Sequence, residues 1–255
     1  MRLATWNVNG LRARIDFVKI WLEEREPDVV GMQELKLTED EFPMEVFTEL
    51  GYEVLMYGQK GWNGVAVASR LPMSLVTRGL PGEEDAGARL ITANVDDLAF
   101  TTVYVPNGKD TDHADFPGKL AWLEALAAHM GADRTDSAVL CGDFNVVHQH
   151  VDSWRAAAAD GRVFHTPEER SRLEALMQTG FCDLFREHHG DEQKFSWWDY
   201  RGGAFHRGHG LRIDLILGTA RVRERMREIV IDRDFRKKHD GLTASDHAPV
   251  ILDIE

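Results

Sequence analysis

The sequence predicts an α/β fold in which two β-sheets pack face to face and helices cover their outer sides. Two observations lead to this prediction. Short apolar runs typical of strands alternate with segments whose apolar residues recur at helical spacing, and no linker, repeat or low-complexity tract interrupts the alternation. About 43% of the 255 residues are hydrophobic, which is enough for a large core. Residues 1–255 are therefore expected to form one domain.

The first half of the chain is expected to contain most of the strands. Its opening elements are strands at residues 2–8 and 28–33 and helices at 11–24 and 39–50. Five strand patterns follow, at residues 52–57, 64–69, 73–77, 89–95 and 98–105. The connections between these strands are short, so neighbouring strands are expected to pair antiparallel.

The second half alternates helices with strands. A helix is expected at 118–130, where apolar residues recur at helical spacing, and a buried strand at 138–141. Another helix is expected to begin at Thr166, because Thr166 can cap it, proline stands at its first position and glutamate at its third. Further strands are expected at residues 194–198, 211–217, 227–232 and 248–254.

The chain is acidic, since 30 Lys and Arg against 43 Asp and Glu give a formal net charge of −13. Proteins that coat nucleic acid nonspecifically are usually basic, so the charge argues against that class. It allows a protein that gathers acidic residues around a metal ion and keeps a local basic rim. The candidates for such a rim, each with a solvated surface charge as the alternative, are Arg12, Arg14, Lys36, Arg201, Arg207, Arg212 and the run Arg236-Lys237-Lys238.

The sequence also indicates where the protein works. No apolar run is long enough to span a bilayer, and the N-terminal residues lack the features of a signal peptide. A cytoplasmic location is therefore expected. Cys141 and Cys182 are expected to be reduced thiols in the core.

Polar residues repeatedly end the apolar strand patterns. They are Asn7 after LATW, Glu34 after DVVGMQ, Tyr104 and Asn107 in VYVPNG, Asp143 and Asn145 after AVLCG, and Asp246 and His247 before APVILDI. Each residue alone could simply cap a turn, but together such strand ends can converge at one rim of a sheet. Asp214 differs because it lies inside the apolar run LRIDLIL, where a buried carboxylate needs a partner such as a histidine.

Three of these residues predict a metal site. Glu34, Asp246 and Asn7 offer hard oxygen ligands, which suit Mg²⁺ or Mn²⁺ better than zinc. A zinc site built on the pairs His206 and His209 or His188 and His189 is the alternative, but these spacings lack the companion ligands of a structural zinc site.

The remaining polar residues predict phosphodiester hydrolysis by a positioned water. Asp143, Asn145 and His247 could orient water and stabilise a phosphorane-like transition state. Asp214 could hold His247 in one tautomer and favour its charged form. Whether Asp143 or His247 is the general base stays open at this level.

The sequence resembles the exonuclease III/AP endonuclease family, within the endonuclease–exonuclease–phosphatase superfamily. The resemblance covers nearly the whole chain, in family order. The matching segments are TWNVNGLRAR (5–14), PDVVGMQELK (27–36), GWNGVAVASR (61–70), VYVPNG (103–108), LCGDFNV (140–146), TPEERSRLEAL (166–176), FSWWDYR (195–201), GLRIDLIL (210–217) and SDHAPV (245–250). The segments GDFN and SDH are shared across the superfamily, whereas FSWWDYR followed by GLRIDL is typical of its DNA-repair branch.

The resemblance implies a DNase I-like, four-layer α-β-β-α sandwich and a Mg²⁺-dependent DNA-repair phosphodiesterase, with Mn²⁺ able to substitute. Such an enzyme would cut double-stranded DNA on the 5′ side of abasic sites and remove 3′ nucleotides or blocking groups as a monomer. It also implies roles for single residues. The metal-site positions of the family are matched by Glu34, Asp246 and Asn7, with Asp143, Asn145 and His247 beside them. Its catalytic positions are matched by Tyr104, Asp143, Asn145, Asp214 and His247. Positions on the substrate side are matched by Asn107 and Arg212.

Trp197, Leu211 and Ile213 match an apolar pocket that would receive a flipped-out abasic sugar. Flipping a nucleotide that has no base costs little stacking energy, and an apolar pocket would exclude normal nucleotides by size. The alternative is that Trp197 and Trp198 are ordinary core aromatics.

The sequence departs from the family pattern at three places. Leu35 stands where a small polar residue is usual, Ala244 stands where proline is usual, and residues 151–162 match poorly. Two other functions remain as alternatives: a superfamily phosphatase that acts on lipids or small phosphoesters, and a catalytically silent DNA-binding protein. The first would not need FSWWDYR and GLRIDL, and the second should have lost an essential group.

Overall fold

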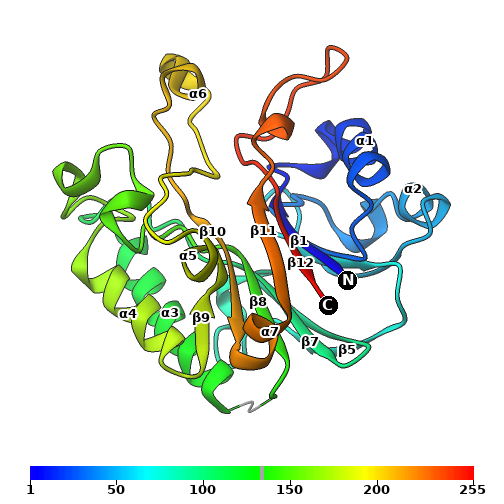
Figure 1. The fold of residues 1–255 in the computed structure, drawn as a ribbon, viewed down its shortest axis with the longest axis horizontal. Helices are drawn as coiled ribbons and strands as arrows, with labels where there is room; N and C mark the ends of the chain where they lie inside the picture. Colours follow the sequence, from blue (N-terminus) through cyan, green and yellow to red (C-terminus); the bar gives the residue numbers. More distant parts are fainter. Residues whose placement is uncertain (133–134) are drawn as a thin grey trace.

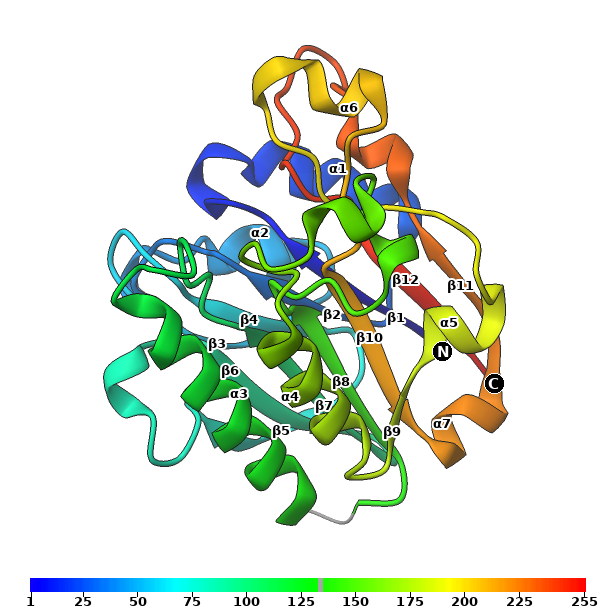
Figure 2. The same cartoon turned by 90° about the vertical axis from the view of Figure 1, so that its left-hand side faces the viewer.

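The first and last strands of the chain lie side by side in the middle of one sheet. In the computed structural model, which describes residues 1–132 and 135–255, β1 (Arg2–Asn7) pairs antiparallel with β12 (Val250–Ile254) and parallel with β2 (Val29–Gln33). This six-stranded sheet is completed by β11 (Met226–Ile231), β4 (Val65–Ser69) and β3 (Glu53–Tyr57), in the order β11-β12-β1-β2-β4-β3. The two chain ends are neighbours in both views (Figures 1 and 2).

The second six-stranded sheet contains the remaining strands. Their order is β5 (Met73–Arg78), β6 (Leu90–Val95), β7 (Leu98–Tyr104), β8 (Ala138–Asp143), β10 (Asp214–Thr219) and β9 (Phe181–Asp183). β5, β6 and β7 pair antiparallel, as their short connections predicted, whereas β8 joins β7 in parallel. Apolar side chains from both sheets, among them Val67, Ile91 and Val139, fill the space between them.

Helices cover the outer face of each sheet, which gives the predicted four layers (Figure 1). α1 (Ile15–Arg25) and α2 (Met44–Glu49) pack on the first sheet through residues such as Phe17, Trp21 and Phe47. α3 (Asp115–Ala132) and α4 (Pro167–Met177) pack on the second through Trp122, Leu126 and Leu173. In the part of the chain that the structure describes, no helix is both long enough and apolar enough to cross a membrane.

The start of α4 agrees with its sequence signal. The Thr166 hydroxyl accepts a hydrogen bond from the backbone N–H of Glu169 at 3.1 Å, and the Glu169 carboxylate accepts one from the N–H of Thr166 at 3.0 Å. Both cysteines are free thiols, with Cys141 in the core between the sheets and Cys182 half-buried.

Three of the predicted elements are wrong in detail. The helix expected at 39–50 is a 3₁₀ turn at Glu39–Glu41 followed by α2, because Pro43 interrupts it. The strand expected at 194–198 is irregular, with only isolated bridges from Trp197 to Leu211 and to His247. The strand expected at 211–217 begins three residues later, at Asp214.

The short elements of the second half were not predicted. These are β9 and the helices α5 (Leu184–His189), α6 (Ala204–Arg207) and α7 (Ala220–Arg225). They are too short for the periodicity of their sequences to be recognised. α6 lies at the tip of a loop that rises beside the loop before β12 (Figure 1).

Candidate active site

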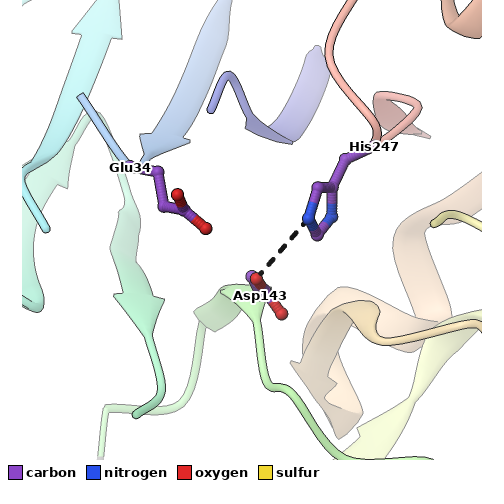
Figure 3. Close-up of side chains that lie close together, drawn as sticks. All are labelled: Glu34, Asp143 and His247. Atoms are coloured by element: carbon purple, nitrogen blue, oxygen red, sulfur yellow. Dashed lines mark ion pairs between the residues drawn. The ribbon is translucent and has the colours of Figure 1, made fainter. Parts of the chain in front are cut away.

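Glu34, Asp143 and His247 meet where strands of both sheets end (Figure 3). Glu34 follows β2, Asp143 ends β8 and His247 lies shortly before β12. One ligand atom from each of the three lies within 4.8 Å of the others. These three residues are called the acidic centre below. It joins the two sheets, since β2 and β12 belong to one and β8 to the other.

The amide of Asn7 links the two carboxylates of the acidic centre. Its nitrogen donates to Glu34 Oε1 and to Asp143 Oδ2, both at 2.9 Å. Its oxygen accepts the backbone N–H of Asn9 at 2.9 Å, which fixes the orientation of the amide. The predicted role of Asn7 as an oxygen ligand is therefore not the arrangement seen here, because the nitrogen, and not the oxygen, faces the centre.

Asp143 is the most deeply buried carboxylate of the centre. Burial, and then the neighbouring charges of Asp214 and Glu34, raise its pKa to about 7, although the nearby His247 opposes the shift. Its Oδ1 accepts the backbone N–H of Asn145 at 2.9 Å. The carboxylate is thus held rigidly and can exchange a proton near neutral pH.

His247 is fixed through its other nitrogen. Nδ1 contacts both oxygens of Asp214 at 2.9 and 3.0 Å, and Ser196 donates to the same carboxylate at 2.6 Å. Burial alone would lower the pKa of His247, but Asp214 and Asp143 outweigh it and raise the pKa to about 10. A protonated His247 directs its Nε2 toward Asp143 Oδ2, 3.8 Å away. The partner expected for the buried Asp214 is therefore His247.

Glu34 differs from Asp143 in its electrostatics. Burial raises the pKa of Glu34, yet Lys36 and the amide of Asn7 outweigh this and lower it below its usual value. Lys36 forms an ion pair with it at 2.8 Å. The backbone of Glu34 lies in the left-handed region at φ 53°, a strained conformation that directs the carboxylate into the centre.

Asp246 lies beside the acidic centre and not within the group of three. Its oxygens accept hydrogen bonds from Asn9 Nδ2 at 2.8 Å and from the indole nitrogen of Trp197 at 3.1 Å. Burial raises the pKa of Asp246, but His247, Asn9 and Trp197 outweigh it and lower the pKa. Asp246 is thus ionised and connects the centre to Trp197.

Tyr104, Asn107 and Asn145 border the centre on the side of β7. Burial, and then Glu34 and Asp143, raise the pKa of the Tyr104 hydroxyl well above its usual value, so the hydroxyl keeps its proton. Asn107 is exposed, and its amide nitrogen donates to Asn145 Oδ1 at 3.3 Å. Asn145 in turn donates to the carbonyl of Val105 at 3.0 Å. These groups present hydrogen-bond donors next to the carboxylates.

The three residues predicted to form an apolar pocket do pack together. Leu211 and Ile213 are buried against Val147, and the half-buried Trp197 and Phe164 pack on the same cluster. Trp198, by contrast, is only 1% exposed and belongs to a separate cluster, so it is the core aromatic of the alternative interpretation.

The prediction that Arg212 contacts substrate or forms part of a basic rim is wrong. Arg212 is 1% exposed, and its guanidinium is saturated by the carboxylates of Asp152 and Asp183. Arg236 is also buried, where it donates to the carbonyls of Trp198 and Asp246. The burial of these two arginines could not be predicted from the sequence, because the local sequence around an arginine does not indicate whether its partner is a phosphate or a buried aspartate.

The other rim candidates remain at the surface. Arg12 and Arg201 are exposed and paired with Glu41 and Asp199. Arg207, Lys237 and Lys238 are exposed as well, whereas Arg14 and Lys36 are half-buried.

Several polar residues of the site were not predicted. Asn9 bridges Asp246 and Lys36, Ser196 holds Asp214, and Arg89 lies over the ring of Tyr104. Lys119 is a buried lysine behind Asn107 and Asn145. Only Lys119 left a clear signal in the sequence, since it lies on the same helix face as Phe116 and Leu123, which are apolar and buried.

The donor set of the acidic centre fits a hard divalent cation. Carboxylate oxygens of Glu34 and Asp143 lie within 4.8 Å of each other and of a ring nitrogen of His247, and carboxylate oxygens are the ligands that a cation such as Mg²⁺ prefers. Across residues 1–132 and 135–255, this is the only group of three such side chains close enough to hold a metal ion, so the histidine pairs at 188–189 and 206–209 do not form one.

Comparisons with known proteins agree with this geometry. A model of the Endonuclease/Exonuclease/phosphatase family matches residues 4–247. The chain is 34% identical to exodeoxyribonuclease III of Haemophilus influenzae over 98% of both chains.

Solved structures show the same fold over the full length. The 3′ phosphatase NExo from Neisseria, bound to a product DNA hairpin, superposes with a TM-score of 0.96 at 33% identity and covers 100% of this chain and 99% of its own. An AP endonuclease from Archaeoglobus fulgidus superposes with a TM-score of 0.95 at 34% identity, over 100% of this chain and 99% of its own.

Proposed function

Because the chain belongs to the endonuclease/exonuclease/phosphatase family and is a phosphodiesterase of the exonuclease III and AP endonuclease type, we propose that it hydrolyses the DNA backbone on the 5′ side of abasic sites and removes nucleotides or blocking groups from 3′ ends. The observation that carries this proposal is the acidic centre, where two carboxylates and a histidine backed by Asp214 converge at the ends of both sheets.

The metal of this centre is proposed to be Mg²⁺, with Mn²⁺ as a substitute. Glu34 and Asp143 would hold it through their carboxylates, with Asp246 and the amides of Asn7 and Asn145 around them. A bound Mg²⁺ would withdraw charge from the phosphate oxygens and lower the pKa of a nearby water. Asn7 keeps the two carboxylates at a fixed separation through its paired hydrogen bonds.

The proton chemistry follows from the two shifted groups. The Asp143 carboxylate, ionised beside a bound cation, is placed to accept a proton from the attacking water. His247, with a pKa of about 10, is a cation that can stabilise the charge growing on the phosphate. Asp214 and Ser196 keep its Nδ1 occupied, so that Nε2–H faces the reacting group.

The groups around the centre would orient the phosphate. Tyr104, which keeps its proton, and the amides of Asn107 and Asn145 supply neutral donors for its oxygens. The part of the proposal that concerns abasic sites is supported by the cluster of Trp197, Leu211 and Ile213. Trp197 lies at its exposed side and is tied to the centre through Asp246.

We further propose that residues 1–255 act as one catalytic domain and as a monomer on double-stranded DNA. The pairing of β1 with β12 joins the first and last strands in one sheet, and both sheets contribute residues to the centre. We also propose a cytoplasmic location, and a rim for the DNA backbone in which exposed Arg207 takes part and Arg12 and Arg201 exchange Glu41 and Asp199 for phosphate.

Three duplexes test the function side by side: one with a single abasic-site analogue, one with a 3′-phosphate and one blunt and undamaged. Each is incubated with the purified protein and Mg²⁺, and a parallel series contains EDTA. Cleavage 5′ to the abasic analogue and release of 3′ phosphate or nucleotides are expected with Mg²⁺ alone. If none of the three duplexes is processed above the EDTA control, the proposal is wrong.

Trp197→Ala tests the abasic part separately. The substitution should slow abasic-site cleavage more than 3′-end trimming, because only the abasic sugar would enter the pocket. Equal losses on both substrates would remove Trp197 from a pocket for that sugar.

A further inference from the structure

Lys119 is a fully buried lysine for which the proposed chemistry has no use. It lies on the face of α3 that packs against the second sheet, with 0% of its side chain exposed. Its ammonium donates to the carbonyl of Asn145 at 2.7 Å, to the carbonyl of Asn107 at 3.2 Å and to the carboxylate of Glu169. An ammonium has three N–H donors, so every donor of Lys119 has a partner inside the protein.

The three partners belong to three separate segments. Asn107 lies in the turn after β7, Asn145 in the turn after β8, and Glu169 in the first turn of α4. Glu169 is itself fixed, since it accepts hydrogen bonds from the backbone N–H groups of Thr166 and Phe164, both at 3.0 Å. Lys119 therefore connects the start of α4, which is rigid, to the turns after β7 and β8 that carry Asn107 and Asn145.

The turns that Lys119 holds carry the two amides proposed to contact the phosphate. Gly108, at φ +84°, packs against the stem of Lys119, and an added Cβ there would come within 3.0 Å of it. Asn145 has a left-handed backbone at φ 49°, a conformation that needs support from its surroundings. With both carbonyls fixed, Asn107 and Asn145 keep the 3.3 Å contact between their side chains.

A lysine near a phosphate site would ordinarily be taken as a phosphate ligand. Here that interpretation fails on three counts: the side chain is fully covered, its donors are all used, and Glu169 neutralises its charge. We propose that Lys119, held by Glu169, is a positioning residue that sets the Asn107 and Asn145 amides for catalysis and does not touch the phosphate. The proposal rests on the proposed function for its catalytic consequence.

The test compares Lys119→Met with Leu126→Ala, a matched control that removes a buried side chain from the same helix. Both variants should melt at a lower temperature than the wild type. Lys119→Met should lower kcat on a cleaved duplex about 10- to 100-fold, whereas Leu126→Ala should stay within about twofold. The salt dependence of duplex affinity should be the same in all three proteins, because no phosphate contact is lost.

A double-mutant cycle shows whether Lys119 acts through Asn145. If it does, Lys119→Met should cost little further activity in a protein that already carries Asn145→Ala. Fully additive losses would overturn the proposal. So would a salt slope smaller by about one in Lys119→Met, which is the result expected for a lost phosphate contact.

Glu169→Gln replaces Lys119→Met should the latter fail to fold. It keeps the shape of the side chain but removes its charge, and it should lower kcat with an unchanged salt slope. A higher duplex affinity or a steeper salt slope would mean that the freed lysine reaches phosphate, which contradicts the proposal.

Hydrogen exchange separates this proposal from the proposed function. In Lys119→Met, backbone amides around 107–109 and 144–147 should exchange faster than in the wild type, while Leu126→Ala should leave the exchange of these two turns unchanged. Unchanged exchange in both turns overturns the positioning role even if the enzyme is active. A wild type without nuclease activity would overturn the function, while the exchange data would still test the positioning.

Discussion

This protein has two clusters of buried charged side chains, and they differ in the balance between acidic and basic groups. One is the acidic centre of Glu34, Asp143 and His247. The other, called the arginine anchor here, consists of Arg212, Arg186, Asp152 and Asp183. In the anchor, Arg212 donates to Asp152 at 2.6 and 3.0 Å and to Asp183 at 2.7 and 3.2 Å, and Arg186 adds a second cation.

The two clusters differ in how completely the protein neutralises them. In the anchor, burial raises the pKa of Asp152, but the two guanidinium groups outweigh it and lower the pKa below its usual value. In the centre, burial and neighbouring carboxylates raise the pKa of Asp143 to about 7. Two arginines against two aspartates make a structural connection, whereas the unbalanced carboxylates leave room for a cation from solution.

The anchor also explains the segment that matches the family poorly. Asp152 lies in residues 151–162, and its backbone carbonyl accepts the N–H of Arg212 at 2.8 Å. Arg212 is two residues before Asp214, the partner of His247. The anchor thus ties this divergent segment to Arg212, in the stretch that leads into β10 and Asp214.

The largest effect is expected when a charge of the acidic centre is removed. Asp143→Asn or His247→Ala should lower the cleavage rate at least about a thousand-fold, because each removes a group that acts on the reacting atoms. Duplex binding should survive. The measurement is single-turnover cleavage together with binding in EDTA, and near-normal turnover in either variant would refute the assigned roles.

The corresponding change in the anchor should affect stability instead. Arg212→Met leaves Asp152 and Asp183 buried without their main partner, which should lower the free energy of unfolding by roughly 3–5 kcal/mol. Turnover per folded molecule, measured at low temperature, should fall less than about tenfold. A hundredfold loss of kcat with unchanged urea unfolding would mean that Arg212 contacts substrate after all.

The two clusters should also respond differently to alkaline pH. The pKa of His247 is raised from 6.5 to about 10, so between these values the folded protein holds a proton that the unfolded chain releases. The stabilisation by this proton is complete below pH 6.5 and is lost as pH rises through about 10. Within that window the free energy of unfolding should fall by about 1.4 kcal/mol for each pH unit.

Urea unfolding in EDTA at pH 8 and pH 10 measures this contribution. Asp143, with a pKa of about 7, is largely ionised in both states over this range and adds little. The wild type should lose more stability than His247→Asn between the two pH values, while the deficit of Arg212→Met should stay constant. Equal losses in wild type and His247→Asn would contradict the assigned charge of His247.

The smallest effect is the stabilisation by Mg²⁺. A cation that binds the folded centre alone should add about 2.7 kcal/mol at a hundredfold excess over its Kd, or a melting point higher by several degrees. Glu34→Gln should lose most of this gain. Asp253→Asn, which removes a carboxylate from a surface pair with Arg2, is the control and should keep it. An equal gain in Glu34→Gln would place the metal elsewhere.

The sequence predicted much of this structure because its signals are local or repeat regularly. The long strands, the main helices and the Thr166 cap all follow from apolar spacing or from a few adjacent residues. The partner of Asp214 could also be anticipated, since a carboxylate within an apolar run needs one. The resemblance supplied the four layers and the set of site residues, whose roles remain predictions.

What only the tertiary structure decided is where the charges go. The sequence analysis places Arg212 on the substrate side and gives Lys119 no role, yet both are buried and matched by carboxylates from distant segments. Asn7 presents its nitrogen to the centre because the backbone of Asn9 occupies its oxygen. The physical reason is that burial makes the free energy of a charge depend on its partners, and those partners lie up to 60 residues away for Arg212 and 136 for Asn7.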